Sequence, residues 1–271
     1  MKRRISIILI VLIFLAGAGF FLRLAGTKNS SSSLPGLDNT ETTASSGAPT
    51  VPDTPSTPTT PVVSSPPSSS TTSPSQTSDI ILLDVPFTSQ APFGQWSDPV
   101  YQNACEEASI LMADLWIDGV KSISKQDATT DIKSLADFED KRFNTFYDLS
   151  TSDTAQLMKE YYNYDKIQVK TNITADDIIQ ELLNGNVVIV PMNGQELHNP
   201  YYTGAGPAEH KILVKGYDFK TNEFITNDCG TRHGESYRYP KDVFFNAIRE
   251  YPTGYKEPIT SIVKIMMVVS K

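Results

Sequence analysis

Basic residues are scarce in most of this 271-residue chain. Five of its 23 Lys and Arg residues precede residue 30, and the part from Asp79 onward holds 18 Lys and Arg against 28 Asp and Glu. That part therefore carries a net charge of −10, with His counted as neutral. Because nucleic acids and anionic lipid surfaces attract positively charged partners, this composition argues against a nucleic-acid-binding protein.

Aromatic residues are missing from Ser30–Ser78, which contains nine of the chain's 18 prolines. A segment of this kind buries too little apolar surface to offset the entropy that is lost on ordering. Proline recurs at every third position from Pro49 to Pro61, which favours extended polyproline II. At ~3.1 Å per residue, about fifty extended residues reach ~150 Å. We therefore predict a disordered spacer over residues 29–79 rather than a ligand for proline-binding modules.

Charged residues are absent from Ile5–Leu22, which follows Lys2-Arg3-Arg4 and ends before Arg23. A helix of this length, at ~1.5 Å per residue, spans ~27 Å, which is enough for a hydrocarbon core. The alternative is a cleavable signal peptide, since Ala16-Gly17-Ala18 resembles a cleavage site, but the apolar run continues beyond it. We therefore expect residues 1–28 to form a transmembrane anchor.

The charges on either side of this expected anchor indicate its orientation. Three cations precede the helix and two follow it, which favours a cytoplasmic N-terminus. Cysteine is absent from this region, which excludes lipid attachment there. We therefore expect a single-pass protein of the cell membrane whose residues 80–271 form an extracellular domain on the cell-wall side.

The ~190 residues of this domain are enough for one core, and they contain no internal repeat. Apolar spacing predicts helices at Asn103–Ile117, Ala175–Leu183 and Lys241–Arg249. Apolar or alternating runs predict strands at Val187–Val190, Lys211–Tyr217, Phe224–Asn227 and Ile262–Val269. Because helices come first and strands mostly later, the pattern favours an α+β fold over a doubly wound sheet. Asn103 and Glu106 resemble a capping box at the start of the first helix.

Cysteine and histidine are scarce: the chain has two cysteines, Cys105 and Cys229, and three histidines, His198, His210 and His233. In an exported protein, two cysteines can form one disulfide. A reactive thiol is the alternative, because Cys105 falls in the first turn of a predicted helix, where the helix dipole favours a thiolate. The neighbouring acidic residues oppose this by raising the pKa of the thiol, so a thiolate needs an imidazolium nearby.

His210 begins a predicted strand, on the face of Ile212 and Val214 that we expect to be buried. A core histidine is the alternative to a catalytic base, and His198 and His233 fall in predicted loops. A base histidine needs an acceptor for its second ring nitrogen, and the next strand offers two. An odd number of residues in the hairpin loop brings Asp228 to the face of His210, and an even number brings Asn227. A simple turn residue remains the alternative for Asp228.

Four stretches stand in a characteristic order: Asp84–Gln90, Ala104–Met112, Gly204–Asp218 and Phe224–Arg232. Together they resemble the C39-like branch of papain-clan cysteine peptidases, over roughly Asp84–Lys271. The resemblance implies a papain-like α+β fold in which an N-terminal helix that carries Cys packs on an antiparallel sheet that carries His and Asp. It also implies a peptide or protein substrate, and a reaction that needs no metal and no organic cofactor.

The same resemblance assigns roles to individual residues. It makes Cys105 the nucleophile, His210 the general base, Asp228 the residue that orients His210, and Gln90 the donor to the oxyanion. The sequence therefore predicts a membrane-anchored extracellular thiol hydrolase, a cysteine peptidase.

Two features depart from the family pattern. Gln90 lies fifteen residues before Cys105, farther than usual, so Gln95 or Gln102 could take its place. Cys229 stands where the family usually has proline, and a disulfide to Cys105 would block the site. The sequence thus leaves two further functions open: a non-catalytic binding module with a Cys105–Cys229 disulfide, and a hydrolase of peptidoglycan peptides.

Overall fold

The computed structural model describes residues 79–254 and 258–271. The expected anchor in residues 1–28 lies outside these ranges, as does the predicted spacer in residues 29–79 apart from its last residue. In the part of the chain that is described, no helix is both long enough and apolar enough to cross a membrane.

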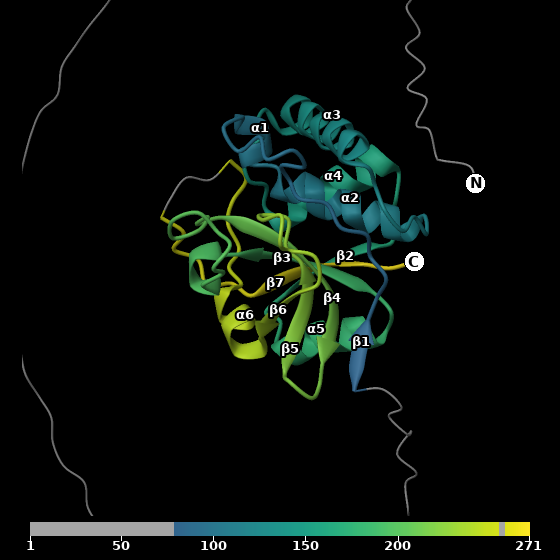
Figure 1. The fold of residues 1–271 in the computed structure, drawn as a ribbon, viewed down its shortest axis with the longest axis vertical. Coiled ribbons are helices and arrows are strands. Elements are labelled where there is room, and N and C mark those ends of the chain that lie inside the picture. Colours follow the sequence, from purple (N-terminus) through teal and green to yellow (C-terminus); the bar gives the residue numbers. More distant parts are fainter. Residues whose placement is uncertain (1–78, 255–257) are drawn as a thin grey trace, which may run out of the picture. The chain divides into compact units, whose positions relative to one another are not determined.

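Seven antiparallel strands form a single sheet (Figure 1). Six of them follow the order β2-β7-β3-β4-β5-β6, and β1 pairs with β4 beyond the end of β3. The strands are β1 Ile80–Leu82, β2 Ile167–Thr171, β3 Val187–Met192, β4 His210–Asp218, β5 Glu223–Asn227, β6 Tyr237–Pro240 and β7 Ile265–Val269. A glycine allows β1 to approach, because a Cβ atom at Gly216 would lie only 2.4 Å from the carbonyl oxygen of Ile81.

Helices cover both faces of this sheet, in two groups (Figure 1). The first group is α1 Pro99–Gln102, α2 Cys105–Ile117, α3 Lys125–Phe143 and α4 Thr151–Tyr162. The second is α5 Ala175–Leu183, the 3₁₀ helix η1 Gly194–Leu197 and α6 Lys241–Ala247. Leu213 of β4 packs in the core on the side of α2, whereas Ile212 and Val214 pack on the side of α5 and α6. The expected α+β fold with an antiparallel sheet is therefore confirmed.

Burial of both faces corrects one expectation. The alternation along β4 predicted one buried face, that of His210, Ile212 and Val214. In the structure every residue of β4 is buried, including Lys211 and Lys215. A charged side chain on the second face therefore has to find its partners inside the protein.

The helix predictions hold except at one start and one end: α6 ends at Ala247, two residues before the predicted Arg249. α5 and its end at Asn184-Gly185 agree with the prediction, and α2 ends as predicted before Gly119, which has φ +72°. The capping box at Asn103 is wrong: α2 begins at Cys105, and no side chain caps it. Asn103 instead ends α1, where its side-chain amide donates to the carbonyl oxygen of Pro99.

Candidate active site

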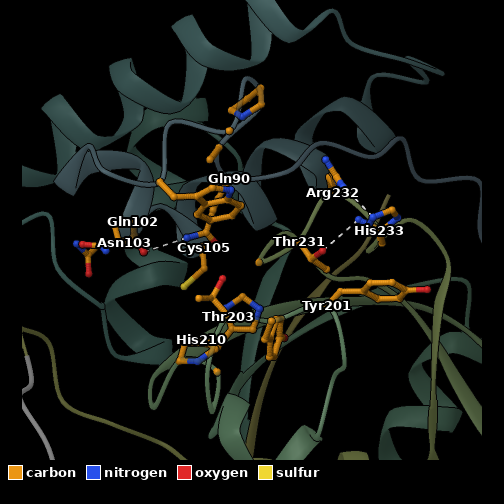
Figure 2. A pocket seen from close by; sticks show the side chains of 18 of the residues that line it. Gln90, Gln102, Asn103, Cys105, Tyr201, Thr203, His210, Thr231, Arg232 and His233 are labelled. Carbon is orange, nitrogen blue, oxygen red and sulfur yellow. Dashed lines mark hydrogen bonds between the residues drawn. The ribbon is translucent and has the colours of Figure 1, made fainter.

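A cavity of about 1100 Å³ lies where the N-terminus of α2 meets the start of β4. Its lining includes Gln90 from the segment after β1, Cys105 from α2 and His210 from β4. Figure 2 shows the Cys105 side chain pointing from its helix toward His210. Asp228 does not line the cavity but is fully buried and bonded to His210. The structure thus brings all four residues of the predicted site to one place.

Cys105 is the first residue of α2, and its side chain is almost fully buried. Its thiol donates a hydrogen bond to Oε2 of Glu106 at 3.0 Å. Burial raises the pKa of this thiol well above its usual value, and the negative charge of Glu106 raises it further. Both effects favour the protonated thiol over the thiolate.

His210 is held from two sides at the start of β4. Its Nε2 lies 2.9 Å from Oδ1 of Asp228, and the ring of Tyr202 packs edge-on against it at 5.8 Å between centroids. Gly230 leaves room for the imidazole, because a Cβ atom there would lie 2.9 Å from Cε1 of His210. The ring therefore has a defined orientation.

Asp228 accepts hydrogen bonds from several groups besides His210. Tyr239 donates from its hydroxyl at 2.6 Å, Tyr202 from its hydroxyl at 2.7 Å and Asn199 from its amide at 3.1 Å. Burial works to raise the pKa of Asp228, but the hydrogen bond and charge of His210, with the two tyrosines, lower it below its usual value. Asp228 is therefore ionised at neutral pH, and because a carboxylate can only accept, Nε2 of His210 carries the hydrogen.

The hairpin of β4 and β5 decides which side chain reaches His210. Asp218 pairs with Glu223, which leaves a loop of four residues, and an even loop by itself predicts Asn227 as the acceptor. However, a β-bulge between Val214 and Gly216 shifts the register by one residue, and Asp228 returns to the face of His210.

Asn227 takes a different role as a result of this bulge. It pairs with Leu213 and donates from its amide to the carbonyl oxygens of Val85 and Pro86, at 3.2 and 3.0 Å. Asn227 therefore anchors the segment that leads to Gln90. The two acceptors that the sequence left open are thereby distinguished, with Asp228 as the partner of His210.

Gln90 lines the cavity, but its amide is already engaged. Its Nε2 donates to the carbonyl oxygens of Tyr101 and Gln102, both at 3.1 Å, and its backbone N–H donates to the carbonyl oxygen of Cys229 at 3.0 Å. Gln90 must therefore release one of these carbonyl groups before it can donate to a ligand. Of the two alternatives, Gln102 lines the cavity, whereas Gln95 lies outside the lining and accepts from the backbone of Phe93.

Cys229 is fully buried beneath this group, and both cysteines are free thiols. The sulfur of Cys229 lies 3.6 Å from Oε1 of Gln90 and 3.6 Å from the backbone oxygen of Cys105. Burial raises the pKa of this thiol well above its usual value. Cys229 thus acts as a buried packing residue and does not cross-link the site.

The side chains around Cys105 also have to be considered as ligands of a metal ion. Among the described residues, Cys105, Glu106 and Asp148 have ligand atoms within 4.8 Å of one another. However, the Nζ ammonium of Lys211 lies 3.0 Å from Glu106 and already neutralises that carboxylate. We therefore assign these oxygens to the protein's own ion pair rather than to a cation.

The sequence reasoning missed several residues of this site. Glu106 was predicted to be a capping-box residue and an anion near the thiol, and Lys211 was predicted to lie on the face opposite the buried one. The contacts of Tyr202, Tyr239 and Asn199 with Asp228 were not predicted, because no local pattern shows that residues so far apart meet around one carboxylate. A lysine in an otherwise apolar strand was the one available signal of a buried ion pair.

Comparisons with known proteins give the family. The sequence profile of the Peptidase_C39 like family matches residues 82–256. A crystal structure from Bacillus anthracis, described as a candidate C39-like peptidase, is 16% identical, with a TM-score of 0.43 over 71% of this chain and 98% of that one. This likeness is too low to carry further conclusions, and no curated protein matches the chain. Since the profile covers more than half of the sequence, the chain belongs to the Peptidase_C39 like family.

Proposed function

We propose that the protein is a cysteine peptidase in which Cys105 is the nucleophile and His210 the general base, oriented by Asp228. The observation that carries this proposal is the shared cavity, which Cys105 and His210 line while Nε2 of His210 is held by Asp228 at 2.9 Å. Because Nε2 carries a hydrogen toward Asp228, Nδ1 is the ring nitrogen that takes the proton from the thiol.

The proposed reaction has two stages. The thiol first leaves Glu106 and transfers its proton to Nδ1 of His210, as its sulfur bonds to the carbonyl carbon of the substrate. The C–N bond then breaks, and His210 returns the proton to the departing amine. In the second stage, water gives a proton to His210 as its oxygen attacks the thioester carbon. The C–S bond then breaks, and His210 returns the proton to the departing sulfur, which releases the acid and the free thiol.

The oxyanion of each tetrahedral intermediate needs hydrogen-bond donors. The backbone N–H of Cys105 lies at the N-terminus of α2, where N–H groups have no partner within the helix. Gln90 is the proposed second donor, and it exchanges its bond to the carbonyl oxygen of Tyr101 or Gln102 for one to the oxyanion.

The outer walls of the cavity support a peptide substrate. Three aromatic side chains line it and remain exposed, Phe93 at 57%, Trp96 at 39% and Tyr201 at 51%. Exposed aromatic residues that gather in one cavity are typical of a binding site. We propose that they hold apolar side chains of the substrate on either side of the bond that is cut.

The location of the enzyme is part of the proposal. The apolar run Ile5–Leu22 and the Pro-rich Ser30–Ser78 support a domain tethered outside the cell membrane, with its cavity able to reach into the cell wall.

The decisive test is hydrolysis of a quenched-fluorescence peptide library by the full-length protein. We expect Cys105→Ala to abolish hydrolysis and His210→Ala to lower it by about 100-fold or more, since the general base is lost. His198→Asn is the matched control, because His198 is exposed, lies outside the cavity lining and has φ +52°, which asparagine tolerates. Hydrolysis that persists in Cys105→Ala would exclude the proposed nucleophile.

A further inference from the structure

A buried ion pair lies beside the thiol of Cys105, and neither of its members gains or loses a covalent bond in the proposed reaction. Glu106 is 1% exposed and Lys211 is 0% exposed. Nζ of Lys211 lies 3.0 Å from Oε1 of Glu106, and Lys211 also donates to the backbone oxygen of Leu149. Tyr251, also fully buried, places its hydroxyl within reach of both charges, at 3.1 Å from Lys211 and 3.3 Å from Glu106.

The two oxygens of Glu106 have different partners. Oε1 accepts from Lys211, from Tyr251 and from the backbone N–H of Leu149 at 3.1 Å. Oε2 accepts from the thiol of Cys105 at 3.0 Å. The first three contacts fix the carboxylate from β4, from the C-terminal segment and from the segment before α4. The other oxygen is therefore presented to the sulfur in one defined orientation.

The surrounding carboxyl groups leave Glu106 as the ionised one. Burial raises the pKa of Glu139 to about 9 and that of Asp148 to about 10, and it raises the pKa of Glu107 well above its usual value. Burial also works to raise the pKa of Glu106, but the Lys211 ammonium outweighs it and the pKa is lowered. The titratable groups that face Glu106 are Cys105 and Glu107 of α2, Glu139 of α3, Asp148 before α4, Lys211 of β4, Cys229 after β5 and Tyr251 of the C-terminal segment.

We infer that Glu106, fixed by Lys211, is a positioning residue that holds the Cys105 thiol in a protonated resting orientation, from which it is released to His210 when substrate binds. This inference rests on the proposed function. A buried ion pair costs desolvation that apolar residues of similar size avoid, so stability alone does not explain it. Oε2 of Glu106, the oxygen that Lys211 does not contact, accepts the hydrogen bond of the Cys105 thiol, and this contact gives the ion pair a role in thiol reactivity. An idle enzyme then keeps its thiol unreactive toward adventitious electrophiles.

The test is the pH dependence of alkylation of Cys105 by iodoacetamide in the full-length protein. Peptide mapping then quantifies the alkylation of Cys105 and of Cys229 separately. The variant is Glu106→Gln with Lys211→Met, which removes both charges together and leaves no unpaired buried charge. We expect the midpoint of the alkylation profile to fall by about one pH unit, because an anion in contact with the thiol is lost. The positive charge of Lys211 lowers the pKa of the Cys105 thiol, so its loss acts in the opposite direction. This effect is the smaller one, because Lys211 contacts only Oε1 of Glu106, the oxygen that does not bond to the thiol.

Glu107→Gln is the matched control. Glu107 is the next residue of α2 and is equally buried, and neither of its carboxylate oxygens bonds to the thiol. Its substitution is expected to leave the midpoint unchanged. An unchanged midpoint in the double variant would overturn the inference, whatever happens to its thermal stability.

Glu106→Asp provides a second variant in case the double variant does not fold. It keeps the negative charge for Lys211 but draws the carboxylate back by one methylene, so the midpoint is expected to fall by a smaller amount. A midpoint equal to that of the wild type in Glu106→Asp contradicts the positioning role. Alkylation reads the thiol without any peptide substrate, so failure of the inference is distinguishable from absence of peptidase activity.

Discussion

Asp228 illustrates how much of this site depends on one buried side chain. Within the described structure it accepts from His210, Tyr202, Tyr239 and Asn199, and from the backbone N–H of Gly230 at 3.0 Å. Five donors converge on one carboxylate, so any substitution leaves several buried groups without their acceptor. Asp228 therefore supports both the orientation of His210 and the stability of the fold around it.

We expect Asp228→Asn to lower the free energy of unfolding by about 2–3 kcal/mol at neutral pH. The amide replaces one accepting oxygen with a donor and removes the charge that strengthens the remaining hydrogen bonds. Urea denaturation of the full-length protein measures this change. Asp176→Asn is the control, because its side chain is 85% exposed and its only recorded ion pair, with Lys241, is 3.7 Å long. A loss as small as that of the control would mean that the donors find other partners.

The same carboxylate gives a prediction for pH. Its pKa in the folded protein is lowered, so its ionised form stabilises the fold above the unfolded pKa of about 4. This contribution is lost as the pH falls through the lowered folded pKa. The difference in stability between wild type and Asp228→Asn should therefore shrink below about pH 4, as followed by thermal unfolding across pH. A constant difference would show that the charge of Asp228 does not matter.

At the scale of single residues, the sequence predicted the positions of Cys105, His210 and Gln90 around one site but not their electrostatics. Hydrophobic patterns assign charged residues to the surface, so they cannot show that Lys211 is buried against Glu106. The pairing requires a sheet that is covered on both faces, which is a property of the whole fold.

At the scale of elements, the hairpin of β4 and β5 shows why register is hard to derive from sequence. The loop has four residues, which by itself would place Asn227 on the face of His210. The bulge near Lys215 shifts the pairing by one residue and places Asp228 there instead. Gly216 is the one local signal in this stretch, because an isolated glycine in a strand suggests a bulge or a close backbone approach, but it does not say which of the two. By contrast, α5 has both a capping box at Thr174 and an end at Asn184. Helix ends carry local chemical signals, and a strand register depends on the partner strand.

Some elements were not predicted at all, among them α3, α4, β1, β2 and β6. In α3 only five of nineteen residues are buried, and one of them is Glu139. Its apolar stripe is therefore narrow. The strands β1 and β6 have three and four residues, too few for an alternating pattern to stand out.

We expect Gly216→Ala to lower the free energy of unfolding by about 1–3 kcal/mol through β1. A Cβ atom at this position would lie 2.4 Å from the backbone oxygen of Ile81, so β1 has to move away from β4. Leu82→Ala is the control, because Leu82 lies in β1, opposite Gly216, but is 57% exposed. Equal unfolding midpoints for the two variants in urea would show that β1 adds little to the stability of the sheet.

At the scale of the whole molecule, the covered sheet explains how one cavity is built from distant parts of the chain. The group of helices on one face supplies Cys105. Of the strands that are buried between the two groups, β4 supplies His210, and Asp228 directly follows β5. The segment that carries Gln90 is tied to the same place by Asn227 and Cys229. These elements are held both by apolar packing and by buried polar contacts, such as the ion pair of Glu106 in α2 with Lys211 in β4, and both kinds of contact help to fix the site.

The proposed location is a property of the full chain, and it can be tested in a bacterial host. We expect the full-length protein to sediment with membranes, and protease added to spheroplasts to remove the domain that follows residue 79. Because Ile5–Leu22 is the only run in the sequence that is both uncharged and predominantly apolar over 18 residues, a variant that begins at residue 29 should lose membrane association. Replacing Ser30–Ser78 with a Gly/Ser linker of equal length is the matched control, since it leaves the apolar run in place. Sedimentation of the shortened variant with membranes would show that another part of the chain holds the protein there, and the tether would have to be abandoned even if the peptidase activity were demonstrated.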